Sequence, residues 1–80
     1  MNRSWILHHL EEAQEALQAL IRDIKADNEF NFSDYLIDME HLYNHLNTAW
    51  NSRDVDERHV RESVEEDFYR WRKFPADIHL

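Results

Sequence analysis

The fold is decided by residues 6–24, which read ILHHLEEAQEALQALIRDI. Apolar side chains recur there at alternating intervals of four and three residues, which places them on one face of an α-helix. The members of this stripe are Ile6, Leu10, Ala13, Leu17, Leu20 and Ile24, with Leu7 and Ile21 widening it. The spacing predicts a helix over residues 5–27, with Ser4 as its N-cap and Asn28 as a left-handed residue after its end.

Two more stretches repeat the helical spacing, over residues 34–51 and 55–74. The third stretch opens with Asp54 and Glu57 spaced as a capping box, and it must end before Pro75. Short connections favour antiparallel neighbours, so the expected fold is all-α: one domain, residues 1–80, forming an antiparallel up-down-up three-helix bundle. The predicted core contains Leu10, Leu17, Leu20, Ile24, Met39, Leu42, Leu46, Val60, Val64, Phe68 and Trp71.

The composition excludes several classes of function. Eighty residues contain no glycine and no cysteine, which argues against glycine-rich phosphate loops, thiol nucleophiles and thiolate metal sites. The formal net charge is −8, so nucleic acid and anionic membrane surfaces are not expected partners. There is no apolar run of membrane-spanning length and no signal-peptide core, and the cytoplasm is the expected location. Residues 28–52 carry four acids and no Lys or Arg, which would suit a basic protein partner.

Six histidines are the most unusual feature of the composition. His41 and His45 are one helical turn apart, and Asp38 lies three residues before His41, so the three form a ribbon along one edge of the second predicted helix. With His9 on the corresponding edge of the first helix, this set predicts a divalent-metal site of imidazole and carboxylate ligands. The alternative is that these side chains hydrogen-bond one another at the helix edges. No other cofactor is expected.

A second possible metal motif lies in Glu11-Glu12-Ala13-Gln14-Glu15. This EExxE string resembles the first metal-binding motif of the MazG-like helical nucleotide pyrophosphohydrolases. The resemblance implies a Mg²⁺ site shared with an ExxD motif on a second helix. The second helix here offers Asp34 and Asp38 instead, with Asp in place of the first Glu. A solvated acidic face is the alternative reading, and no catalytic residue is assigned.

Three tryptophans are more than a small bundle easily buries, and aromatic residues are enriched at protein interfaces. Trp5, Trp50, Tyr69 and Phe74 are therefore the predicted interface residues, and the alternative is that the aromatic residues cap the two ends of the core. The first helix is about 35 Å long, which is too long for its two partners to cover, so a homodimer is expected. The alternative is a monomer in which Phe30, Phe32 and residues 78–80 cover the apolar stripe. The function predicted by elimination is a small acidic protein–protein interaction module without catalytic activity. A divalent-metal protein is the alternative, and a MazG-like enzyme a more distant one.

Overall fold

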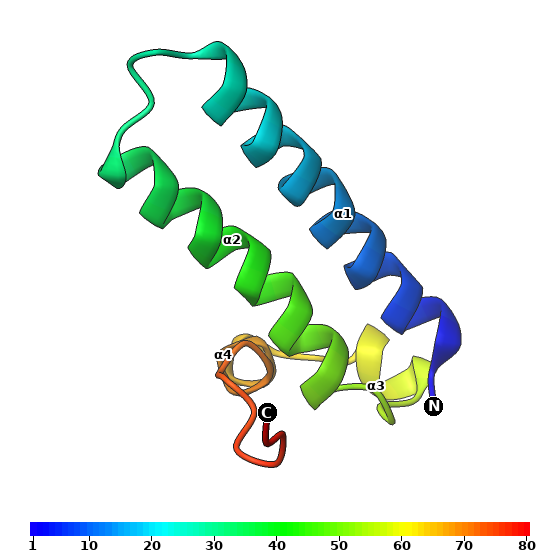
Figure 1. Cartoon of the computed structure of the whole chain (residues 1–80). Coiled ribbons are helices and arrows are strands. Elements are labelled where there is room, and N and C mark those ends of the chain that lie inside the picture. The colour runs from blue at the N-terminus through cyan, green and yellow to red at the C-terminus, as the bar shows by residue number, and fades with distance from the viewer.

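Two long helices lie side by side in opposite directions and dominate the computed structural model, which describes all 80 residues (Figure 1). They are α1 (Arg3–Ala26) and α2 (Phe32–Asn51), and together they form a hairpin. Two short helices, α3 (Glu57–Arg61) and α4 (Glu65–Trp71), lie at the end of this hairpin where the chain begins. There is no strand, and the predicted all-α class is confirmed.

Side-chain caps set where the long helices begin. Asn2, not Ser4, is the N-cap of α1, and its side chain accepts from the Trp5 backbone N–H. Asn31 caps α2 in a capping box: its side chain accepts from the Asp34 N–H, and the Asp34 carboxylate accepts from the Asn31 N–H, both at 3.2 Å. Each cap satisfies backbone donors that have no partner inside the helix.

The hairpin turn contains no left-handed residue, so the conformation expected of Asn28 was wrong. Asp27 organises the turn instead. Its carboxylate accepts from the Glu29 N–H at 2.9 Å, and its carbonyl accepts from the Phe30 N–H at 3.1 Å. An Asx-type turn of this kind reverses the chain without positive φ, which suits a sequence that has no glycine.

The stretch 55–74 differs from the prediction because it forms two short helices instead of one. Its first cap is Asp56, whose carboxylate accepts from the His59 N–H at 2.7 Å. The Ser63 hydroxyl then donates to the Val60 carbonyl at 2.6 Å, and Asp67 accepts from the Val64 N–H at 3.0 Å. These local side-chain bonds replace the helical ladder between α3 and α4.

The buried apolar core is small: Ala13, Leu20, Leu42, Ala49 and Trp71. Much of the predicted core was wrong, since these members of it are exposed: Leu10, Leu17, Ile24, Leu46, Val64 and Phe68. The reason is the length of α3 and α4, which cover one end of a molecule 45 Å long and leave the rest of the hairpin bare. None of the helices is long and apolar enough to cross a membrane.

Candidate functional site

Four histidines gather between α1 and α2, and we call them the histidine cluster: His8, His9, His41 and His45. The His9 and His45 Nδ1 atoms are 3.2 Å apart, within hydrogen-bond distance. The His8 ring centre lies 5.0 Å from that of His9, and the His41 ring centre lies 5.6 Å from that of His45. The Trp5 ring meets His9 edge-on at 4.4 Å and closes the cluster on one side.

Burial controls the protonation of this cluster. Desolvation, with the charges of His8 and His45, lowers the pKa of His9 to about 4, and Glu12 partly opposes them. The pKa of His45 is lowered too, first by burial and then by His41. At neutral pH the two rings are therefore neutral, and one Nδ1–H donates to the other Nδ1. The remaining ring nitrogen of His9, Nε2, is buried without a hydrogen-bond partner.

The predicted metal ligands are only partly brought together. His9 and His45 are in contact and His41 is at the edge, whereas Asp38 lines an acidic groove of about 290 Å³ near the hairpin turn. The acids of that groove are Asp23, Asp27, Asp34 and Asp38. No group of three or more His, Cys, Asp or Glu side chains is arranged to hold a metal ion. The metal site stays a prediction.

Sequence reasoning missed one member of the histidine cluster and one residue beside it. The member is His8, which is adjacent to His9 in the chain, and that adjacency was the available signal. The neighbour is Glu12, which is half-buried and whose charge raises the pKa of His9 and His45, whereas the sequence analysis considered it only as part of the EExxE string.

The carboxylates compared with the MazG-like motif do not share one groove. Glu11 and Glu15 are exposed on α1, and Glu12 lies beside the histidine cluster. Asp34 and Asp38 line the acidic groove, which none of the three glutamates lines. This arrangement offers no observation in favour of the enzyme reading.

Both predicted interface tryptophans form hydrogen bonds within the chain. The Trp5 Nε1–H donates to the Ser52 hydroxyl at 2.8 Å, and the Trp5 ring packs edge-on against Trp71 at 6.1 Å. The Trp50 Nε1–H donates to the Asp77 carboxylate at 2.9 Å. Both indoles are half-buried, so they are less available to a partner than their sequence positions suggested.

The other two predicted interface residues are at the surface. Tyr69 is exposed beneath the Arg72 guanidinium, 4.1 Å from its ring centre. Phe74 is 70% exposed and meets the Tyr43 ring edge-on at 5.1 Å. Because its aromatic ring is largely exposed, Phe74 is available for contact with a partner.

One side of the hairpin carries a continuous apolar surface, which we call the hairpin face. Its residues are Leu10, Leu17, Ile21 and Ile24 of α1 and Tyr35, Met39, Tyr43 and Leu46 of α2. The four α1 side chains are between 42% and 50% exposed. With a rotation of 100° per residue, each set lies about 90° around its helix from the residues that face the other helix. Because the two helices are antiparallel, both sets then point to the same side of the hairpin. A shallow groove lined by Ile6, Leu10, Leu46 and Trp50 joins the two sets.

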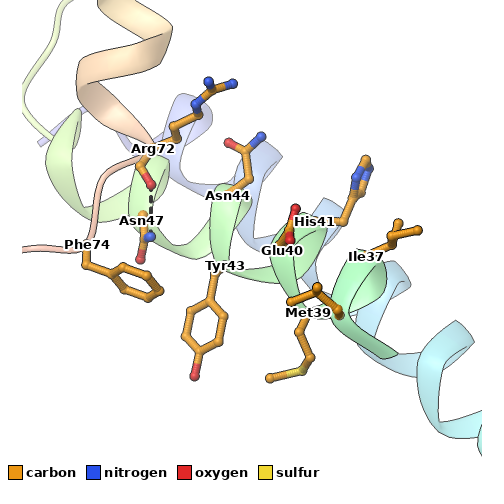
Figure 2. Close-up of a pocket in the computed structure, with 10 residues that line it drawn as sticks. Ile37, Met39, Glu40, His41, Tyr43, Asn44, Asn47, Arg72 and Phe74 are labelled. Atoms are coloured by element: carbon orange, nitrogen blue, oxygen red, sulfur yellow. Dashed lines mark hydrogen bonds between the residues drawn. The ribbon is translucent and has the colours of Figure 1, made fainter. Parts of the chain in front are cut away.

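A larger groove of about 730 Å³ continues the hairpin face around the outer side of α2. Figure 2 shows Met39, Tyr43 and Phe74 projecting to one side of this groove, whereas Asn44 and Arg72 project to the other. The Asn47 side chain donates to the Arg72 carbonyl at 2.9 Å and fixes the C-terminal segment against α2. The apolar surface therefore extends from α1 across α2 to Phe74.

Comparisons of the chain with protein-family models, with curated proteins and with solved structures found no match.

Proposed function

We propose that this chain is a protein–protein interaction module without catalytic activity, and that it binds through the hairpin face. One observation carries the proposal: apolar side chains spaced as bundle-core residues are left exposed along both long helices. A surface of this kind marks a binding site, because soluble monomers rarely expose contiguous apolar patches larger than a few hundred Å². The expected compartment remains the cytoplasm.

The total surface of the chain supports the same proposal. Its accessible area is 6362 Å², whereas a compact monomer of 9.9 kDa exposes about 5,200 Å². Its radius of gyration is 14.4 Å, against about 11.6 Å for a compact domain of this length. The excess is about 1,200 Å², which is the scale of surface that one chain contributes to a substantial protein interface.

Site-specific photocrosslinking in living cells tests the proposal. A photoreactive phenylalanine analogue replaces Leu17 on the hairpin face, and the matched control replaces Glu15, an exposed residue on another side of α1. The expected result is a discrete protein adduct from position 17 and none from position 15. Adding Leu10→Lys to the same chain should abolish the adduct, because it places a charge on the face that the partner covers.

Mass spectrometry of the adduct identifies the protein bound. Equal labelling from positions 15 and 17, or no adduct from either, would contradict the proposal. Circular dichroism of the purified variants checks that the helices remain formed.

A further inference from the structure

The hairpin face has the layout of a surface that pairs with a copy of itself. We propose that its occupant is a second copy of this chain, with the hairpins packed face to face across a twofold axis and their turns at opposite ends. This inference rests on the proposed function and names its partner. The product is a four-helix bundle in which α1 lies antiparallel to the second copy's α1, and α2 to its α2.

The apolar stripes of the two helices have their midpoints at the same height. On α1 the exposed stripe runs from Leu7 to Ile24 and is centred between Gln14 and Leu17. On α2 it runs from Phe32 to Leu46 and is centred on Met39. Because the two helices run in opposite directions with equal rise and are in register at the His9–His45 contact, Met39 lies level with the centre of the α1 stripe. One twofold axis at this height serves both helices.

This axis matches apolar residues with apolar residues along α1. The stripe there repeats every seven residues, at Leu7, Gln14 and Ile21 and at Leu10, Leu17 and Ile24. When two such α1 helices pack antiparallel, each residue of the Leu7 series in one copy lies opposite a residue of the Leu10 series in the other copy. Leu7 then faces the second copy's Ile24, and Leu10 faces its Ile21. The only polar member, Gln14, falls next to the axis, where one polar residue can fix the register of a helix pair.

The same axis gives partners to the two most exposed phenylalanines. Phe32 and Phe74 are 74% and 70% exposed, and Phe32 lies at the turn end of α2. In the proposed dimer, the second copy's Phe32 comes level with Leu46, about one turn from Tyr43 and the Phe74 that packs on it. Aromatic residues from both copies then meet at each end of the α2 pair.

Charge favours turns at opposite ends over turns at the same end. The turn end carries the acidic groove of four aspartates, with Arg22 and Lys25 nearby at the end of α1. At the other end, residues 53–80 hold eight acids and six bases, and three of these bases, Arg70, Arg72 and Lys73, lie close together in the sequence at the end of α4. Opposite-end packing brings each acidic groove toward these three bases of the other copy. Same-end packing would place two acidic turns together, and like charges in contact disfavour an arrangement.

Single-cysteine crosslinking tests this arrangement, because the chain contains no cysteine of its own. We expect Met39→Cys, which lies on the twofold axis, to form a disulfide-linked dimer under mild oxidation. Glu15→Cys, outside the hairpin face, and Asn28→Cys, in the turn, should stay monomeric on a non-reducing gel. Crosslinking through position 28 in place of position 39 would overturn the opposite-end arrangement.

Two further measurements make the test independent of disulfide chemistry. Sedimentation equilibrium should give twice the 9.9 kDa chain mass, and a mass of one chain at tens of micromolar would overturn the dimer. Spin labels on Asn28→Cys should lie at a distance comparable to the 45 Å length of the molecule, whereas same-end packing would bring them within about 10–20 Å. Leu17→Lys should halve the mass while circular dichroism retains its helical signal, and Glu15→Lys should leave the mass unchanged.

These outcomes separate this inference from the proposed function. A photocrosslinked adduct with a different protein, combined with the mass of one chain, would leave the interaction module standing and remove the second copy as its partner. Failure of the adduct and of the dimer together would remove both.

Discussion

The two ends of the hairpin contrast in how well they are covered. At the closed end, where α1 begins and α2 finishes, Trp71 is 3% exposed and Ser52 is fully buried. At the turn end, Ile24 is 50% exposed and Ile37 is 63% exposed. Both ends are built from helices with similar apolar content, so the difference lies in the cover. Residues 53–80 pack on the closed end only.

This contrast shows that apolar spacing predicts a buried face without saying which chain buries it. The closed end is completed by the chain's own C-terminal segment. The turn end and the middle of the hairpin have the same kind of face and no segment of the chain to cover it. In our proposal, the closed end supplies the stability of one chain, and the open part supplies binding.

Removing the closed end's anchor should have the largest effect. Trp71→Ala deletes the most buried large side chain, which packs edge-on against Trp5 and Phe68, and should lower the free energy of unfolding by about 3–5 kcal/mol. Tyr69→Ala is the matched control on the same helix and should change it by less than about 1 kcal/mol, because Tyr69 is exposed. Urea unfolding at one protein concentration measures both. Equal losses would show that the closed end is not anchored by Trp71.

Acid should weaken the closed end through His9. Its folded-state pKa of about 4 lies below the unfolded value of 6.5, so the unfolded chain binds the proton more readily between these pH values. The stability that depends on neutral His9 is complete above pH 6.5 and is lost as the pH falls to 4, to a total of about 3 kcal/mol.

Urea unfolding across this pH range checks the effect of His9. His9→Asn should flatten the loss over pH 6.5–4, whereas His79→Asn, an exposed residue of the C-terminal tail, should follow the unmodified chain. Carboxylates titrate in the same range, so the difference between variants is the quantity to compare. A His9→Asn curve that parallels the unmodified one would contradict the assignment.

Detaching the C-terminal segment should have an intermediate effect. The Asn51 side chain donates to the Trp71 and Lys73 carbonyls, both at 2.7 Å, and so ties α2 to the end of α4. Asn51→Ala leaves these acceptors without that donor and should lower the free energy of unfolding by about 2 kcal/mol. Asn28→Ala, at an exposed amide of the hairpin turn, is the control. Hydrogen exchange should quicken in residues 65–73 of the Asn51 variant and remain unchanged there in the Asn28 variant.

Metal ions should have the smallest effect. The Nδ1 atoms of His9 and His45 are 3.2 Å apart, but no group of three or more His, Cys, Asp or Glu side chains is arranged to hold a metal ion. A structural zinc site needs four ligands. Protein purified without a His tag should therefore melt at the same temperature with zinc in micromolar excess and with EDTA. A rise of several degrees with one equivalent of zinc would revive the predicted site of Asp38, His41, His45 and His9.

The long helices were predictable because their evidence is local. The four-and-three spacing of residues 6–24 needs no tertiary information, and α1 spans it. The caps were not predictable in the same way: the sequence favoured Ser4 and Asp54 where the structure has Asn2 and Asp56, and the start of the second helix was predicted two residues late. The third helix failed because Ser63 and Asp67 bond locally to the backbone, which the apolar spacing of Val60, Val64 and Phe68 does not reveal.

The candidate site was less predictable, because it depends on which residues face each other across the hairpin. The contact between His9 and His45 followed from their matching helix edges. The place of Asp38 in the acidic groove depends on the height at which α1 and α2 pair, which sequence spacing does not fix. The exposure of Leu10, Leu17 and Leu46 depends on the shortness of α3 and α4.

The start of α1 is held by residues that follow it by half the chain or more. The Asn2 N–H donates to the Arg53 carbonyl at 2.7 Å, and the Asn2 side chain donates to the Val55 carbonyl at 2.9 Å. The Ser4 hydroxyl reaches Glu57 at 3.2 Å. During synthesis on the ribosome, α1 emerges before these partners, so its first turn gains these bonds only after residues 53–57 have left the exit tunnel.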